Sequence, residues 1–195
     1  AQRSLLIYSL IKKTAGTLSA VFLCYHRNMK KICLLLLTLL LTLTLFANGN
    51  SEEATASVIS FESVDIFGNS VSSQELFSSS KITMINFWAT YCNPCIGELP
   101  FLAKIPANYD PSELQIIGII TDATNQNAYD KAISLIKEKG VDSYIHLLPS
   151  SSMNDVLSNI SVVPTTLFVN NKGEIIKSVL GSNTFKRWQE IISEL

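Results

Sequence analysis

Long apolar runs in the second half of the chain predict buried β-strands. Residues 82–88 and 114–120 consist almost entirely of aliphatic, aromatic and β-branched residues. Continuous runs of this kind are typical of strands that are buried on both faces. Shorter runs predict three more strands, over residues 144–148, 165–169 and 174–180. The turn residues 170–173 separate the last two, which predicts that they form a hairpin.

Helical periodicity fills the intervals between these strands. Residues 125–139 place Ala and Ile side chains on one helical face, and Gly140 follows as a helix-ending residue. We expect a helix over residues 93–105, kinked at Pro100, because proline lacks the amide that the helix needs. Two further helices are expected, over residues 153–157 and 184–195.

The region before the first long strand has shorter elements. The turn signal at residues 67–69 lies between apolar residues and predicts a short hairpin, and residues 73–78 predict one helical turn. Strands that alternate with helices and end in a hairpin and a helix predict a three-layer α/β domain, with a central mixed sheet flanked by helices. We expect this domain to cover residues 58–195.

The first 57 residues have a different pattern. Met29-Lys30-Lys31 precedes an apolar run over residues 32–46, which predicts a signal peptide over residues 29–49. The alternative is an uncleaved membrane anchor, although the run is shorter than the ~20 residues of a comfortable membrane span. We interpret residues 1–28 as an upstream or non-native extension, the alternative being a second membrane segment. The polar residues 50–57 are interpreted as a linker.

Charge divides the chain at the same place. All 16 Asp and Glu residues lie at or after Glu52. Residues 51–195 contain only nine Lys and Arg, so this part of the chain has a formal net charge of −7. Nucleic-acid binding requires clustered basic residues, so an acidic domain argues against it. From the leader over residues 29–49 we expect an exported protein, in the periplasm or on the outer face of the cytoplasmic membrane, whose one contact with the membrane, if it has any, is an uncleaved leader.

Candidate chemistry is concentrated in Cys92-Asn93-Pro94-Cys95, at the point where a buried strand turns into a helix. Helix-terminal amides and the helix dipole stabilise a thiolate at the first cysteine. We expect Cys92 to be the nucleophile and Cys95 to resolve the mixed disulfide. If the two cysteines were half of a zinc site, two further Cys or His ligands would be required, and the domain offers only His146. An inert structural disulfide is the other alternative, and no metal or cofactor is expected.

The segment Phe87 to Cys95 resembles the active-site signature of thioredoxin-like proteins. The continuation Ile96-Gly97-Glu98-Leu99-Pro100 is similar to the TlpA/ResA-like branch, and the resemblance extends from Phe61 to Leu195. It implies a thioredoxin-like fold with an N-terminal hairpin and an inserted strand-helix unit. Tyr91 departs from the family, which more often has Trp before the first cysteine.

The resemblance also implies a client-binding loop. It predicts a cis peptide bond before Pro164 and pairing of the Val163 backbone with an extended client segment. We expect Trp88 to be partly exposed beside the thiols as a further substrate contact, the alternative being a core residue. His146 is interpreted as a structural histidine.

Glu98 follows Cys95 by about one helical turn, on the same face of the expected helix. A carboxylate there accepts and returns the proton of the buried thiol. The alternative is an exposed Glu that only interacts with the helix dipole. Asn86 occupies the strand position where thioredoxin has a buried Asp, and Asn86 cannot titrate.

The expected function is reduction of protein disulfides, with apocytochrome thiols in cytochrome c maturation as the clients that the resemblance suggests. The expected partners are client proteins with disulfides or thiols and a membrane electron donor of thiol type. A disulfide-forming oxidase is the first alternative, although no His lies between the cysteines. A peroxidase is disfavoured by Ala89, which stands where such enzymes have Thr. A non-catalytic client-binding module is the last alternative.

Overall fold

The structure is a computed structural model that describes residues 57–195. The expectations for residues 1–56, including the signal peptide and most of the linker, lie outside the described residues. Within residues 57–195, no helix is both long enough and apolar enough to cross a membrane.

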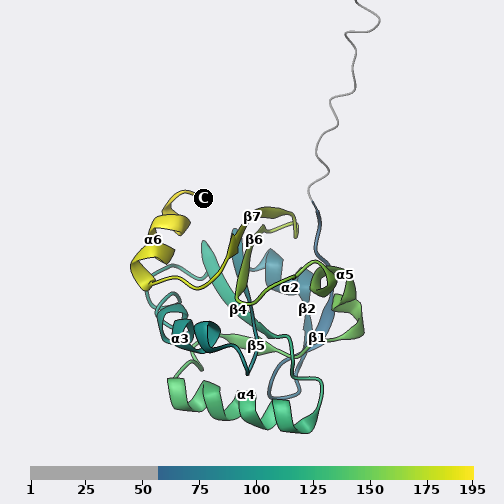
Figure 1. Cartoon of the computed structure of the whole chain (residues 1–195). Helices are drawn as coiled ribbons and strands as arrows, with labels where there is room; N and C mark the ends of the chain where they lie inside the picture. The colour runs from purple at the N-terminus through teal and green to yellow at the C-terminus, as the bar shows by residue number, and fades with distance from the viewer. Residues whose placement is uncertain (1–56) are drawn as a thin grey trace, which may run out of the picture. The chain divides into compact units, whose positions relative to one another are not determined.

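A five-stranded mixed sheet forms the centre of the domain (Figure 1). Its strands, in spatial order, are β5 (Ile145–Leu147), β4 (Leu114–Ile120), β3 (Ile82–Trp88), β6 (Thr165–Asn170) and β7 (Ile175–Leu180). The first three are parallel to one another. The strand β6 pairs antiparallel with β3, and β7 pairs antiparallel with β6. The sequence predicts the bounds of β3 and β4 correctly, because both strands are buried along nearly their whole length.

A short hairpin protects one edge of this sheet. It consists of β1 (Glu62–Val64) and β2 (Ser70–Ser72), as the sequence predicts. The chain around β1 contacts the outer edge of β5: the Ile66 amide donates to the His146 carbonyl, and the Leu148 amide donates to the Val64 carbonyl, both at 3.0 Å. These bonds satisfy backbone groups that an edge strand would otherwise leave open.

Helices cover both faces of the sheet (Figure 1). On one face, α3 (Asn93–Leu102), α4 (Gln126–Lys139) and α6 (Phe185–Ser193) enclose a core that contains Met84 and Trp88 of β3. On the other face, α2 (Ser73–Ser78), the 3-10 turn η1 (Ser151–Met153) and α5 (Asn154–Ser158) enclose Ile85 and Phe87. The alternation along β3 confirms the expected three-layer α/β fold with a thioredoxin-like arrangement.

Several helix ends differ from the sequence prediction. The helix α3 ends at Leu102, not at residue 105, because the Lys104 and Ile105 amides bond to carbonyls only three residues earlier and form tight turns. The helix α6 is shorter at both ends, with Thr184 as its N-cap. Pro100 lies inside α3, and Gly140, with φ 61°, ends α4 as predicted.

Candidate active site

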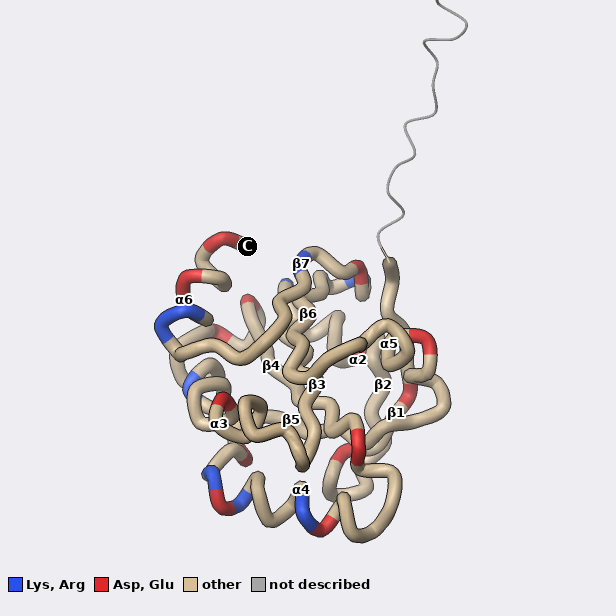
Figure 2. The backbone as a smooth tube through the Cα atoms, viewed as in Figure 1, with Lys and Arg blue, Asp and Glu red and all other residues tan. Residues whose placement is uncertain are grey.

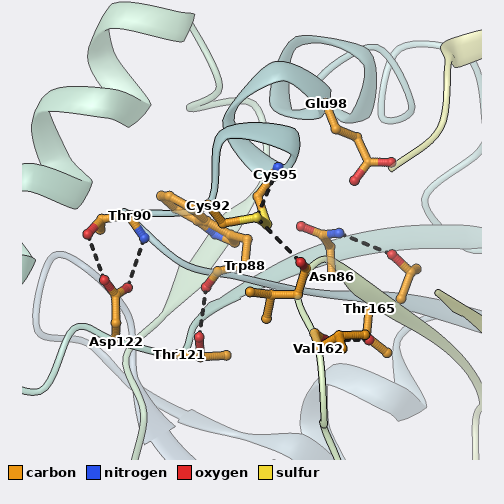
Figure 3. The surroundings of a disulfide bond; sticks show 12 residues. Asn86, Trp88, Thr90, Cys92, Cys95, Glu98, Thr121, Asp122, Val162 and Thr165 are labelled. Carbon is orange, nitrogen blue, oxygen red and sulfur yellow. Dashed lines mark hydrogen bonds between the residues drawn. A yellow bond between two sulfur atoms is a disulfide. The ribbon is translucent and has the colours of Figure 1, made fainter. Parts of the chain in front are cut away.

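The two cysteines lie at the start of α3, next to the end of β3 (Figure 3). Cys92 is the N-cap of the helix and Cys95 lies in its first turn, and the two are joined by a disulfide. The Cys92 Sγ atom accepts a hydrogen bond from the Cys95 amide at 3.2 Å. The exposed fraction is 7% for Cys92 and 1% for Cys95, so a partner sulfur can approach only from the side of Cys92.

The start of α3 stabilises negative charge on Cys92. Amides in the first turn of a helix have no partners within the helix, and the helix dipole adds partial positive charge there. The Cys95 amide already points at the Cys92 sulfur in the disulfide form. Reduction of the disulfide therefore leaves a preorganised donor for the Cys92 thiolate, which lowers the free energy of that form.

A second loop lies against the same sulfur. The peptide bond between Val163 and Pro164 is cis, as predicted, and the Val163 carbonyl oxygen lies 3.5 Å from Cys92 Sγ. The Thr165 hydroxyl donates to the Val162 carbonyl at 2.7 Å and holds the turn. Among the described residues, none accepts a hydrogen bond from the Val163 amide. An extended peptide beside Cys92 therefore has a free backbone donor available.

Glu98 lies on the buried side of α3, with only 2% of its surface exposed. Its Oε1 atom accepts hydrogen bonds from the Asn183 amide at 2.5 Å and from the Trp188 indole at 3.0 Å. Burial raises the pKa of the Glu98 carboxyl to about 7, against the opposing effect of these hydrogen bonds and of nearby Asn86. The alternative of an exposed Glu that acts only on the helix dipole is wrong.

The carboxyl of Glu98 and the amide of Asn86 extend into the same interior space behind Cys95 (Figure 3). Asn86 is fully buried and donates to the Thr166 hydroxyl at 3.1 Å. Among the described residues, neither Glu98 Oε2 nor Asn86 Oδ1 has a hydrogen-bond partner. Glu98 thus combines a pKa near neutrality with a free oxygen atom, two properties that a proton acceptor requires.

The structure corrects the sequence prediction that Trp88 is partly exposed. Its side chain is fully buried, so it cannot contact a client. Position 88 shares the inward face of β3 with Met84, and the indole packs edge-on against His146 at 5.9 Å between ring centroids. The aromatic residue exposed at the site is Tyr91, with 69% of its surface free. Its place directly before Cys92 was the only signal for it in the sequence.

Asp122 is a site residue that sequence reasoning missed. It follows β4 and accepts two hydrogen bonds from Thr90, one from the hydroxyl at 2.6 Å and one from the amide at 3.0 Å (Figure 3). The Thr121 amide donates to the Trp88 carbonyl at 2.8 Å. These bonds tie the loop before Cys92 to the loop after β4. Adjacent parallel strands end at the same edge of the sheet, and that rule is the signal that could have identified Asp122.

His146 is buried on β5, and its Nε2 atom lies 2.8 Å from the Val141 carbonyl. Burial lowers the pKa of His146 to about 4, so the ring is neutral near pH 7. A Cβ atom on Gly118 would lie 2.7 Å from His146 Nδ1 and 3.2 Å from Trp88 Nε1. Within residues 57–195, no three His, Cys, Asp or Glu side chains gather as a metal site would require.

Comparison with known proteins agrees with this geometry. The redoxin family model matches residues 52–191. A thiol-disulfide oxidoreductase ResA from Oceanobacillus iheyensis is 29% identical over 59% of this chain and 57% of its own length. The ResA protein of Halalkalibacterium halodurans is 27% identical over 75% of this chain and 80% of its own length.

Solved structures share the fold. StoA from Bacillus subtilis matches with a TM-score of 0.56 and 25% identity, over 69% of this chain and 97% of that chain. A secreted disulfide oxidoreductase from Mycobacterium tuberculosis matches with a TM-score of 0.57 and 18% identity, over 69% and 96% of the two chains. With its paired cysteines at the start of α3, the chain belongs to the redoxin family of thioredoxin-like proteins and is a thiol-disulfide oxidoreductase.

Proposed function

We propose that this protein is exported and reduces disulfides in client proteins outside the cytoplasm. The observation that carries the proposal is the asymmetry of the dithiol: Cys92 is the accessible helix-capping sulfur, and Cys95 is buried one turn from Glu98, which is buried on the same helix. An accessible nucleophile and a buried resolving thiol are the two parts that dithiol–disulfide exchange uses, and the uncharged residues between the cysteines favour the reductive direction.

The reaction begins with the reduced dithiol. The Cys92 thiolate attacks one sulfur of a client disulfide, a bond forms between Cys92 and that sulfur, and the client's second sulfur leaves and takes up a proton. Glu98 then accepts the proton of the Cys95 thiol, and the Cys95 thiolate attacks Cys92 Sγ. The first client sulfur leaves as a thiol. Two electrons have passed to the client, and the protein holds the Cys92–Cys95 disulfide, the form that the structure contains.

The cis-proline loop is the proposed client-binding element. The Val163 carbonyl lies next to Cys92 Sγ, and we propose that the Val163 backbone pairs with an extended client backbone, with the buried Pro164 following it in the loop. A peptide bound in this way presents its disulfide to Cys92. The proposal gives Val163 and Pro164 a positioning role and leaves the covalent chemistry to the two cysteines.

A reductant outside the cytoplasm needs an electron source, and we propose a membrane protein that donates electrons through thiols. The basic and apolar leader over residues 29–49 supports export, and one structurally similar protein is described as secreted. Apocytochrome thiols, before haem attachment in cytochrome c maturation, are the proposed clients. This choice follows from the resemblance of residues 87–100 to the TlpA/ResA-like branch.

The reduction potential of the Cys92/Cys95 couple tests the direction of electron flow. No charged residue lies between the cysteines to stabilise the reduced form strongly. We expect a potential nearer the ~−270 mV of thioredoxin than the ~−120 mV of a strong oxidant. Equilibration of the protein with glutathione buffers of stated ratio measures it. A potential above about −150 mV on this scale would replace the reductase with a disulfide-forming oxidase.

A further inference from the structure

The two oxygen atoms of the Glu98 carboxyl have different surroundings. Oε1 accepts one hydrogen bond from the Asn183 amide at 2.5 Å and another from the Trp188 indole at 3.0 Å. Oε2 is buried and has no hydrogen-bond partner among residues 57–195. A carboxylate oxygen has two lone pairs, so the two donors occupy both lone pairs of Oε1. A proton that reaches Glu98 therefore binds to Oε2.

Both donors come from the C-terminal part of the chain. Asn183 lies between β7 and α6, and Trp188 lies near the start of α6. The Trp188 side chain is fully buried and belongs to the same core cluster as Cys95. Its ring also packs against that of Phe168 on β6, with 6.2 Å between the ring centroids. The core therefore holds the indole N–H in a fixed place relative to α3.

Resting on the proposed function, in which Glu98 accepts the proton of the Cys95 thiol, we propose that Trp188 is a positioning residue for this proton transfer. The indole, together with the Asn183 amide, holds Oε1 and leaves Oε2 free for the proton. The S–H bond of Cys95 breaks and an O–H bond forms at Oε2. The electron pair that stays on the Cys95 sulfur then attacks Cys92 Sγ.

The hydrogen bond from the indole also sets the pH range in which Glu98 is a base. Burial raises the pKa of the carboxyl to about 7, and the two N–H donors oppose this rise because they stabilise the charged form. Without the indole N–H, the pKa rises further. Glu98 then already holds a proton near pH 7 and accepts none from Cys95.

The other groups near the carboxyl do not replace the indole. Glu98 is the one charged residue of α3, and β3 has none (Figure 2). The titratable groups on α3 and its cap are Cys95 and Cys92, and β3 contributes the neutral amide of Asn86. Tyr144, from the segment before β5, has a pKa that is raised by burial and further by the charge of Glu98. No charged group of residues 57–195 is among the causes that set the pKa of Glu98.

Trp88 provides a matched control. Both tryptophans are fully buried in the same core cluster, but the Trp88 indole has no hydrogen-bond partner among the described residues. Replacing either one with Phe keeps an aromatic ring, removes the N–H group and leaves a smaller side chain. Only Trp188→Phe removes a bond to Glu98. A difference between the two variants therefore measures the hydrogen bond and not the loss of volume.

The aromatic disulfide dithiobis(nitrobenzoate) separates the two steps of the reaction. Its first coloured thiolate is released when Cys92 attacks, and its second is released when Cys95 attacks the mixed disulfide at Cys92. Stopped-flow absorbance records both phases over a range of pH around neutrality. The proteins are the reduced full chains in detergent, and each carries Cys24→Ser and Cys33→Ser so that only the motif reacts.

In Trp188→Phe, the pH midpoint of the second phase should rise by about one unit, because a bond to the charged carboxylate is lost. The first phase should keep the wild-type pH profile. Trp88→Phe should leave the midpoint of the second phase unchanged. Glu98→Gln should alter the second phase by itself, and adding Trp188→Phe to it should cause no further shift, because the indole acts through the carboxyl.

A second measurement requires no change at Trp188. The chain has two tryptophans, so Trp188 is the one that remains in Trp88→Phe. Its fluorescence in the oxidised protein should titrate with the Glu98 carboxyl, with a midpoint near 7. The pKa of buried His146 is about 4, so this ring does not titrate in the same range. Glu98→Gln in this background should abolish the titration, and its persistence would overturn the proposed coupling.

The outcomes separate the positioning role from the reaction. Equal shifts in Trp188→Phe and Trp88→Phe would assign the effect to packing and overturn the proposal. An unchanged midpoint in Trp188→Phe, together with an altered second phase in Glu98→Gln, would also overturn it and leave Glu98 as the proton acceptor. Identical second phases in wild type and Glu98→Gln would overturn the proton transfer itself. A wild-type protein that releases no second thiolate would overturn the proposed function as well.

Discussion

The two cysteines of one short motif have opposite surroundings. Cys92 lies beside exposed Tyr91 and the cis-proline loop, in a stretch of chain that has no charged residue. Cys95 lies in the core, and Glu98 is buried about one turn farther along the same helix. A step of three residues along the chain therefore separates an outer side, where the sulfur is accessible, from an inner side, where the sulfur and the Glu98 carboxyl are buried. The aromatic residues Trp88 and Tyr91 show the same contrast, because Trp88 is buried and Tyr91 is exposed.

Trapping of clients gives the largest difference between the outer and inner sides. Cys95→Ser should accumulate mixed disulfides with client proteins, because Cys92 still attacks and the resolving thiol is missing. Cys92→Ser should trap almost none, because Cys95 keeps only 1% of its surface exposed. Non-reducing gels of acid-quenched cells that express each variant measure the yield of mixed disulfides.

The double variant, with both cysteines replaced by Ser, is the control for background disulfides. Equal yields from the two single variants would remove the distinction between an outer and an inner cysteine. Absence of trapping in both would favour a module that binds clients without catalysis.

Replacing the buried Trp88 should destabilise the protein more than replacing the exposed Tyr91. Trp88→Ala should lower the free energy of unfolding by about 3–5 kcal/mol, because it empties a fully buried site in the core. Tyr91→Ala should change it by less than about 0.5 kcal/mol, since the side chain is mostly exposed. Urea unfolding of the oxidised proteins measures both. A large loss of stability in Tyr91→Ala would show that the outer side also holds the fold together.

The same pair shows what the sequence can predict. The apolar runs of β3 and β4 identify strands whose whole length is buried, and their bounds follow directly. Whether Trp88 faces the core or the thiols depends on which face of β3 the helices cover, and this is a property of the assembled layers. The exposure of Trp88 was therefore predicted wrongly, although the strand that contains it was predicted correctly.

Glu98→Gln tests the inner side through pH. The pKa of Glu98 rises from an ordinary value of 4.5 to about 7 on folding, so the native state holds its proton more tightly than the unfolded chain does. The stabilisation is complete below pH 4.5 and is lost as the pH rises through 7. We expect wild-type stability to fall by on the order of 3 kcal/mol between pH 4.5 and pH 8 from this group.

Urea unfolding of oxidised wild type and Glu98→Gln over that range measures the difference, because the disulfide removes thiol titration. The variant should lose most of the pH dependence, and its rate of thiol exchange in the reduced form should change its pH profile. Asp142→Gln is the control, since Asp142 is exposed. Parallel stability curves for wild type and Glu98→Gln would contradict a carboxyl with a raised pKa behind Cys95.

A smaller loss of stability than that of Trp88→Ala is expected at the loop that carries the outer cysteine. Asp122→Asn weakens two hydrogen bonds from Thr90 and should cost about 1–2 kcal/mol, because bonds to a charged acceptor are the stronger ones. Asp142→Asn serves as the matched control. Thermal unfolding measures the loss, and an unchanged midpoint would show that the loop before Cys92 is held without Asp122.

The partners of Glu98 and Thr90 mark the limit of sequence reasoning. Helical spacing predicts that Glu98 and Cys95 share a face, because that relation is local. The groups that bond to the carboxylate come from Asn183 and Trp188, 85 and 90 residues later in the chain. Asp122 reaches Thr90 across 32 residues. Such pairings depend on how strands and helices assemble, and no short motif encodes them.

Gly118 bears on how this site tolerates sequence change. The residue carries no functional group, yet an added methyl group would lie 2.7 Å from the His146 ring and 3.2 Å from the Trp88 indole. Trp88 is followed by the loop that ends in Cys92, so the crowding would be transmitted to the reactive sulfur. Random mutagenesis that selects for redox activity should therefore recover Gly118 almost unchanged, and designed variants of this domain should treat the position as fixed.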